Sequence, residues 1–250
     1  MAQTLDLVAS DNDRLWTDTT ETAHPSDGGV VGRWESEQGP GTYNFDETTN
    51  KPLWRNPGSV LLLPHVDFDG ANDKLTSETA ISTFISASAF DILVAFIADD
   101  TSSNNAGTYN NDALVSDASG FMGVHIQNGN VRAYNWDGND DSVGVPITAG
   151  NAYVVRARHS GGSLFVSVNG GAESSVVSGN TTTLTAVLRL GLGLSSTFLD
   201  GKIGRVVVAN TGDELGSLYT QMVQDWVTGG ANPPMTDDGG SLLWEAVTAW

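Results

Sequence analysis

Short apolar or alternating segments, separated by turn-forming residues, recur from about residue 60 to residue 209 and constrain the fold most. Residues 89–97 form an apolar run rich in aromatic and β-branched side chains, which predicts a central strand buried on both faces. An Asn-Gly pair at 128–129 lies between two alternating segments and indicates a tight hairpin turn. A Gly-Gly pair at 161–162 separates two further segments. Together these features predict an all-β, two-sheet antiparallel jelly-roll sandwich.

The two ends of the chain have a different pattern. Residues 1–58 show no sustained period, so we expect a lead-in of loops and one or two edge strands that packs on the jelly roll at 59–229. Residues 230–250 begin with a stretch rich in Gly, Pro and Asp and end in a short apolar tail. This composition predicts a linker followed by a docking segment.

One short C-terminal helix is predicted over residues 213–228. Apolar residues recur there at helical spacing, at Leu215, Leu218, Tyr219, Met222 and Trp226. Thr211 and Glu214 match a capping box at its start, and a Gly-Gly pair at 229–230 would end it. We expect this helix to pack on the edge of the sandwich.

Composition excludes several classes of partner. The chain has 11 Lys and Arg against 30 Asp and Glu, a formal net charge of -19, so it lacks the basic face that nucleic acids or anionic membranes require. It contains no Cys, which argues against a disulfide-stapled secreted scaffold. At 250 residues it can bury a large core as one domain. It shows neither a membrane-spanning apolar run nor a signal-peptide pattern, so we expect assembly in a cytoplasm.

Two stretches carry a family resemblance. Residues 153–170 begin with Tyr-Val-Val, continue through Gly-Gly and end in Asn-Gly. A second pattern follows at Phe198, Gly201, Ile203 and Val206, with one extra residue between the first two. Over about residues 14–228 the chain resembles the laminin-G-like (LamG/pentraxin-type) domains of the concanavalin A-like lectin/glucanase superfamily. The resemblance implies a jelly roll with a concave face, in a superfamily of lectins, polysaccharide hydrolases, protein-binding modules and parts of virus particles.

A catalytic role is not expected. The glucanase branch of that superfamily carries Glu-x-Asp-x-x-Glu on one strand, and this chain has no such arrangement. Asp67 and Asp69 do alternate on one expected strand, but Asp69 precedes Gly70 and most simply forms a turn. None of the four His residues lies in a nucleophile motif. We therefore predict a protein that is not an enzyme, with a glycanase using Asp67 and Asp69 as the alternative.

Calcium is the one cofactor that the sequence suggests. Ca²⁺ takes oxygen ligands from carboxylates, amides and backbone carbonyls. Such groups gather in two stretches, and the resemblance implies that calcium can lie at rim loops of this kind. The candidate ligands are Asp99, Asp100, Asp137, Asn139 and Asp141. The alternative is that these residues only form turns in which the side chain bonds its own backbone.

Two stretches also combine the groups from which sugar sites are built, an aromatic platform and hydrogen-bonding amides or carboxylates. One is the expected hairpin after residue 130, and the other is the polar loop at 99–112. The candidate glycan-binding residues are Tyr134, Asn135, Trp136, Asp137, Tyr109 and Asn110. The alternative is that their aromatic rings pack within the hairpin or the core.

These observations favour a non-catalytic, lectin-like structural protein of a virus particle, in the first place a bacteriophage. It would be a head decoration or fibre protein or a tail-associated adhesin on the virion surface, assembled in the host cytoplasm. Its expected partners are other virion proteins, copies of itself and host cell-surface glycans. The apolar tail would dock on a neighbouring subunit or on the particle through Leu242, Leu243, Trp244 and Trp250. The alternatives are a tail folded back on its own domain and an extracellular, secreted bacterial polysaccharide-binding module.

Overall fold

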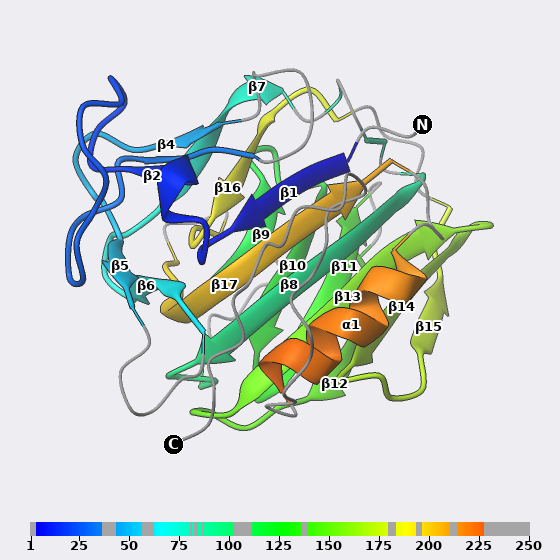
Figure 1. The fold of residues 1–250 in the computed structure, drawn as a ribbon. Helices are drawn as coiled ribbons and strands as arrows, with labels where there is room; N and C mark the ends of the chain where they lie inside the picture. The colour runs from blue at the N-terminus through cyan, green and yellow to red at the C-terminus, as the bar shows by residue number, and fades with distance from the viewer. Residues whose placement is uncertain are drawn as a thin grey trace.

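Two antiparallel β-sheets pack face to face, with one helix on the outer side of the first sheet (Figure 1). This arrangement confirms the predicted all-β sandwich with one short helix near the C-terminus. The structure is a computed structural model, which describes residues 4–36, 44–56, 63–80, 82, 85–86, 88–102, 112–136, 140–179, 184–193, 197–210 and 215–227. Among these residues, no helix is long and apolar enough to cross a bilayer.

The first sheet has eight strands in the order β15-β14-β13-β8-β17-β6-β5, and β1 also pairs with β17. Its strands in chain order are β1 (Thr4–Val8), β5 (Leu53–Arg55), β6 (His65–Asp69), β8 (Phe90–Ala98), β13 (Ala152–Ser160), β14 (Ser163–Val168), β15 (Ser174–Val177) and β17 (Asp200–Ala209). The second sheet has nine strands in the order β12-β11-β10-β9-β16-β7-β4-β3-β2. These are β2 (Leu15–Trp16), β3 (Arg33–Trp34), β4 (Phe45–Asp46), β7 (Leu75–Ala80), β9 (Asp112–Asp117), β10 (Met122–Gln127), β11 (Asn130–Trp136), β12 (Asp140–Pro146) and β16 (Val187–Leu190). A 3-10 turn, η1 (Asn12–Arg14), precedes β2.

The hairpin turns lie where the sequence predicts them. Asn128 and Gly129 join β10 to β11 with φ angles of 49° and 73°, the left-handed pair that a two-residue turn between twisted strands requires. Gly161 and Gly162 join β13 to β14 with φ angles of 58° and 75°. Asn-Gly and Gly-Gly are the pairs that adopt such angles at least cost, which is why these turns could be predicted.

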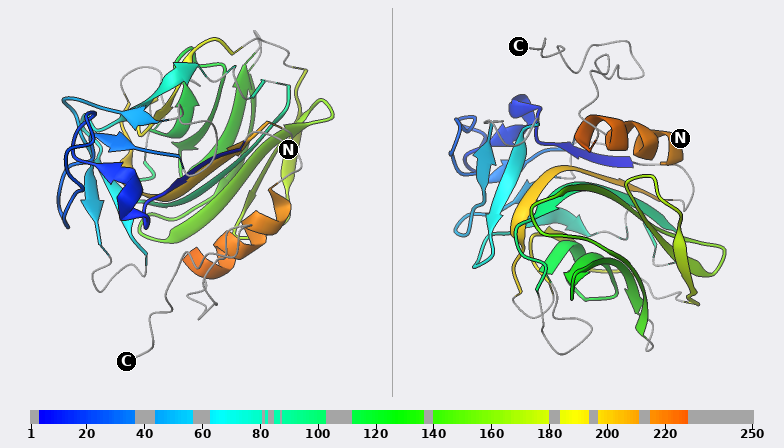
Figure 2. Two further views of the ribbon diagram at one scale, coloured as in Figure 1. Left: turned by 45° about the horizontal axis from the view of Figure 1, so that its top comes forward. Right: turned by 90° about the horizontal axis from the view of Figure 1, so that it is seen from below.

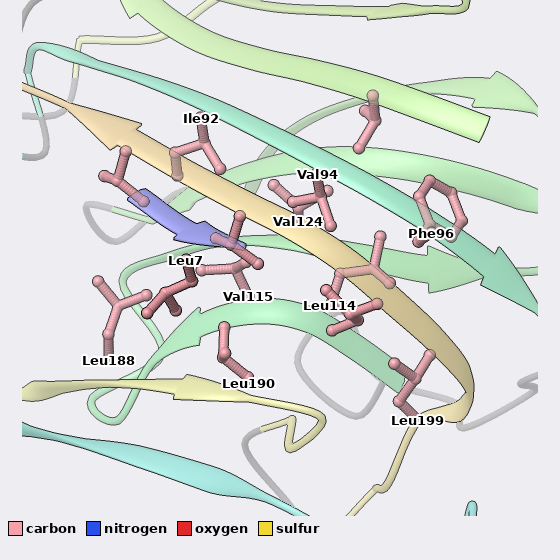
Figure 3. Close-up of a cluster of buried hydrophobic side chains, with 14 of the residues drawn as sticks. Leu7, Ile92, Val94, Phe96, Leu114, Val115, Val124, Leu188, Leu190 and Leu199 are labelled. Atoms are coloured by element: carbon pink, nitrogen blue, oxygen red, sulfur yellow. The ribbon is translucent and has the colours of Figure 1, made fainter. Parts of the chain in front are cut away.

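Strand β8 is the predicted central strand, and all nine of its residues are buried. Ile92, Val94 and Phe96 point between the two sheets, where they meet the apolar side chains of β9, β10 and β16 (Figure 3). Leu93 and Ala95 point the other way, as alternation along a strand demands. Because both sets are apolar, both faces of the eight-stranded sheet must be covered.

The helix α1 (Gly216–Trp226) provides the second cover, and it lies across the outer face of the eight-stranded sheet rather than on its edge (Figure 2). Its Tyr219 and Met222 pack on Leu93, Val154 and Val207. The ring of Trp226 fits over Gly204, where an added Cβ would lie 2.1 Å from the ring. The helix therefore packs its apolar side on the face of the sheet, because the outer side of β8 is itself apolar.

The helix begins differently from the prediction. Thr211 and Glu214 of the expected capping box, and the glycines at 229–230, lie outside the described residues. Leu215 occupies the cap position and has no side-chain cap. Its backbone N–H donates instead to Asp91 Oδ2 of β8 at 3.0 Å, so a buried carboxylate of the sheet satisfies one of the free helical donors.

Residues 4–56 contribute five short strands, where the sequence predicted a lead-in of loops with one or two edge strands. β1 pairs with β17 and β5 pairs with β6, while β2, β3 and β4 extend the nine-stranded sheet. Leu15, Trp34 and Phe45 are fully buried in the core. Strands of two residues are too short to show an alternating period, so only tertiary pairing reveals them.

Asp91 connects the helix to the sheet through a buried ion pair. Its carboxylate accepts bonds from Arg156 Nε at 3.0 Å and Nη2 at 2.6 Å as well as from Leu215, and its side chain is fully buried. Removing it leaves the Arg156 guanidinium without its bidentate partner in a nearly buried site. We therefore expect Asp91→Ala to lower the free energy of unfolding by about 3–5 kcal/mol in urea denaturation.

The matched control for Asp91→Ala is Glu173→Ala. Glu173 also forms a two-bond pair with an arginine, Arg158, but its side chain is about one-third exposed. A pair of this kind is worth under about 1 kcal/mol. Equal losses from the two variants would contradict the role assigned to Asp91.

Candidate functional site

One sheet face carries a row of polar and aromatic residues that is interrupted by a glycine on β10. In the nine-stranded sheet, one residue from each strand lies opposite the next, so that nine side-chain positions cross the sheet from β2 to β12. We call these residues the polar row: Trp16, Arg33, Asp46, Thr76, Arg189, Ser116, Gly123, Tyr134 and Ser142. Adjacent strands lie about 4.8 Å apart, so the row extends about 38 Å along the sheet.

The polar row lies on the side of the sheet away from the core. Neighbouring residues on the same strands form the inner surface, since Leu15, Trp34 and Phe45 lie opposite one another and are buried in the core. Val124 and Val115 do the same in the middle of the sheet. Side chains alternate along a strand, so the row faces outward. The other sheet has α1 on its outer face, so among the described elements this is the sheet face without a helix (Figure 2).

The β10–β11 part of the row is closely packed. His125 folds over Gly123, where an added Cβ would lie 2.5 Å from its Nε2 atom, so only glycine leaves room for the imidazole. The His125 ring meets the Tyr134 ring edge-on, with centroids 5.5 Å apart. On the next strand pair, Arg132 Nη2 donates to Ser142 Oγ at 2.5 Å. Contacts between these side chains therefore fix their positions.

Alternation along β11 places its predicted glycan-binding residues on two opposite faces of the sheet. Tyr134 belongs to the polar row and Trp136, two residues on, lies on the same face and is half-buried. Asn135 points to the opposite side and is 0% exposed, so it cannot reach a ligand on this face. Tyr134 is only 3% exposed, so it presents almost no surface to a ligand. Asp137, Tyr109 and Asn110, together with Asn139 and the tail residues Leu242, Leu243, Trp244 and Trp250, lie outside the described residues.

The residues that sequence reasoning missed come from the other end of the row. Trp16, Arg33 and Asp46 are held side by side by β2, β3 and β4. Arg33 binds Asp46 through two bonds, and also binds Glu21 and Glu78. The only local signals were an apolar residue next to a charged one in β3 and in β4, and such pairs are too short to identify a strand.

Two of the three candidate calcium ligands that the structure describes, Asp99 and Asp100, are engaged with other groups. Asp99 forms an ion pair with Lys202. Asp100 accepts bonds from the N–H and hydroxyl of Ser102, as in a turn in which the side chain bonds its own backbone. Asp141 lies on β12 opposite Asn135. Within the described part of the chain, no three His, Cys, Asp or Glu side chains are grouped to hold a metal ion. The calcium site stays a prediction.

Asp67 and Asp69, the carboxylates considered for hydrolysis, also have structural partners. Asp69 accepts the backbone N–H groups of the three residues that follow Gly70, at 2.9 to 3.3 Å. Burial opposes ionisation, but these donors prevail and lower the pKa of Asp69. Asp67 lies 3.4 Å from Arg55. Gly70 has a φ angle of 71°, so the predicted turn at Asp69-Gly70 is present.

The fold is similar to that of several solved structures. It matches domain 4 of the extracellular GH43 arabinanase AbnA from Geobacillus stearothermophilus, solved with arabinotriose, with a TM-score of 0.51 and 14% identity over 89% of this chain and 98% of that domain. It matches Trypanosoma rangeli sialidase, solved with sialic acid, with a TM-score of 0.55 and 13% identity over 88% of this chain and 32% of the sialidase. The receptor-binding domain of botulinum neurotoxin type G gives 0.52 and 10% identity over 96% of this chain and 54% of that one.

At these identities the likeness shows the fold, a β-sandwich compatible with the concanavalin A-like architecture. The sequence matches no protein-family model and no curated protein sequence. The laminin-G-like subgroup and the phage origin therefore stay predictions. The chemistry of the site has to come from this chain's own residues.

Asp73, which closes the turn at Asp69-Gly70, makes the stability of the protein depend on pH. Burial, and then the negative charge of Asp69, raise the pKa of Asp73 to about 6. A carboxyl whose pKa is raised by folding stabilises the protein when protonated, and this contribution is lost as the pH rises from about 4 through about 6. We expect Asp73→Asn, which keeps the acceptor for the Asp69 N–H, to be more stable than the parent at pH 8 by about 1–3 kcal/mol. The two proteins should converge at pH 4, as measured by thermal unfolding, whereas a constant difference across that range would contradict the assignment.

Proposed function

We propose that the protein is a non-catalytic glycan-binding module that holds an oligosaccharide along the polar row. The observation that carries the proposal is the row itself, an outward line of aromatic, hydroxyl and charged groups that is interrupted at Gly123 and buried at Ser116 and Tyr134. A line about 38 Å long suits an extended chain of sugars rather than a single small molecule. A domain of similar fold, from the arabinanase, was solved with arabinotriose bound and is matched over 98% of its length, which supports this class of ligand.

A binding role is favoured over hydrolysis by the state of the carboxylates on this face. A glycosidase needs two carboxyl groups placed on either side of the bond to be cleaved. Asp46 and Glu78 instead accept bonds from the same Nη2 atom of Arg33, at 2.9 and 2.6 Å. Both carboxylates are therefore engaged by one guanidinium. This arrangement supports recognition of a sugar chain without its cleavage.

We extend the proposal to a setting on a virus particle, as a decoration, fibre or tail-associated protein. Sequence supports this setting: a charge of -19, no Cys and an apolar tail. A protein with this role would display the polar row at the virion surface toward host glycans. Its detection by mass spectrometry in purified particles from its source would support the setting, and its recovery only as a free extracellular protein would favour the secreted polysaccharide-binding alternative.

Trp136→Ala tests glycan binding directly. Trp136 lies beside the row and is half-buried, so its ring can stack on a sugar while its loss leaves the core intact. On a glycan array, repeated with and without Ca²⁺, we expect saturable binding that falls about tenfold in the variant. Dependence on Ca²⁺ would support the predicted calcium site.

The matched control for Trp136→Ala is Phe165→Ala. Phe165 is also a half-buried aromatic residue, but it lies on β14 of the other sheet beneath Arg158. We expect its loss to leave glycan binding unchanged. Equal effects of both variants would assign the loss to folding, and the absence of binding to any glycan would overturn the proposal.

Deletion of residues 240–250 tests the docking tail. Exposed Leu and Trp side chains are costly in water, so we propose that the tail packs on a neighbouring subunit or the particle. We expect the shortened protein to keep its melting temperature but to lose self-association in analytical ultracentrifugation or to lose incorporation into particles. A lowered melting temperature with unchanged assembly would instead show that the tail folds back on its own domain.

A further inference from the structure

We propose that Asn128, in the turn between β10 and β11, is a site of spontaneous chemical modification, at which the asparagine deamidates and the chain rearranges to isoaspartate. The proposal is independent of the glycan-binding function. The sequence contains two Asn-Gly pairs, at 128–129 and at 169–170. The contacts of these pairs differ, so that the first pair can react while the second is protected.

The reaction needs only the chain itself and water. The backbone nitrogen of Gly129, which no side chain hinders, attacks the side-chain carbon Cγ of Asn128 and forms an N–Cγ bond. The Cγ–Nδ2 bond breaks, and ammonia leaves with the proton of the Gly129 N–H. Water then opens the resulting five-membered succinimide ring. Opening at Cγ leaves aspartate at position 128, whereas opening at the main-chain carbonyl carbon leaves isoaspartate, in which the main chain runs through Cβ and Cγ.

The side chain of Asn128 is open to this attack. Asn128 is exposed, and within the described part of the chain its side-chain amide forms no hydrogen bond. A Cβ added to Gly129 would meet no atom within 4 Å, so the space around the attacking nitrogen is also open. The Gly129 N–H donates to the Thr101 carbonyl oxygen at 2.9 Å, and this bond must open first. One such bond shifts an equilibrium by only about fivefold, so it slows the reaction without preventing it.

The second pair is held on both sides of the reacting bond. Asn169 Oδ1 accepts the Val154 N–H at 2.8 Å, so the side-chain amide must leave β13 before it can turn toward the Gly170 nitrogen. The Gly170 N–H donates to Tyr219 Oη at 2.9 Å. Tyr219 is buried beneath α1, and its Oη also accepts a bond from Ser167 Oγ at 3.2 Å. Two bonds therefore have to break before this pair can react.

The two pairs otherwise match closely. Asn128 and Asn169 have φ angles of 49° and 52°, and the glycines that follow them have φ angles of 73° and 74°. A Cβ added to Gly170, as to Gly129, would meet no atom within 4 Å. Because the dipeptide and its backbone conformation are the same, a difference in reactivity would report on the hydrogen bonds alone.

Modification at Asn128 would act on a junction of three chain segments. Besides the bond from Gly129 to Thr101, the Ile147 N–H donates to the Gly129 carbonyl oxygen at 2.9 Å, and Ile147 belongs to the core. Asn130 Nδ2 donates to the Asn128 carbonyl oxygen at 2.9 Å. Isoaspartate adds one atom to the main chain of this two-residue turn, so these bonds cannot all be kept. We therefore expect the modified protein to melt at a lower temperature and to carry one more negative charge.

The test follows both asparagines by peptide mapping with mass spectrometry while the full chain is incubated at mildly alkaline pH. We expect Asn128 to be modified about five- to tenfold faster than Asn169, since one more hydrogen bond must break at Asn169. The control is the same chain unfolded in guanidinium chloride, where both sites should react at similar rates. Equal rates in the folded protein, a faster reaction at Asn169, or an intact Asn128 over a time in which the unfolded chain reacts would overturn the proposal.

Two variants separate the contacts from the sequence. Tyr219→Phe removes the acceptor of the Gly170 N–H but keeps the ring on the sheet, so it should speed modification of Asn169 about three- to tenfold and leave Asn128 unchanged. Asn128→Gly keeps the turn, because Gly161 and Gly162 already form one with both φ angles positive. It should abolish the fall in melting temperature on incubation. An unchanged Asn169 in the first variant, or the same fall in the second, would contradict the roles assigned to these contacts.

Discussion

The double burial of β8 is the constraint on which the rest of the molecule depends. An apolar strand in the middle of a sheet must be covered on both faces, and the nine-stranded sheet covers only one. The helix α1 covers the other, and Asp91 of β8 itself holds the helix start through the Leu215 N–H. Because a helix occupies the outer face of that sheet, the outer face of the nine-stranded sheet is the one that we propose for ligand binding.

On that outer face, register rather than local sequence creates the site. Apart from Gly123, each member of the polar row is an ordinary polar or aromatic residue on its own strand, and the strands come from positions 15 to 190 of the chain. Pairing places them opposite one another, and a shift of one residue in any strand would exchange its row member for a core residue. The buried Trp34 and Phe45 fill the core. Because side chains alternate along a strand, their burial also directs the adjacent Arg33 and Asp46 outward.

This explains which features the sequence could predict. The hairpins at 128–129 and 161–162 and the strand at 89–97 depend on residues near one another, so their local pattern suffices. The helix was predicted from its periodicity, but its cap depends on Asp91, more than a hundred residues away. Of the predicted sugar-site residues, Trp136 and Tyr134 share the outer face, while alternation along β11 places Asn135 on the opposite, buried side. The contacts of Arg33 with Asp46 and Glu78 depend on pairing between two-residue strands, which no local pattern reveals.

The two ends of the row differ in how much of their bonding capacity is used internally. Near β10 and β11, His125 fills the space over Gly123 and meets Tyr134, so side chains there mainly order one another. At the β2–β4 end, Arg33 forms ion pairs with Glu21 and Glu78, whose side chains remain partly exposed to solvent. The burial of a cation beneath partly exposed anions fixes the sign of the charge at this surface. The exposed carboxylates set that sign, because the Arg33 charge beneath them is already paired.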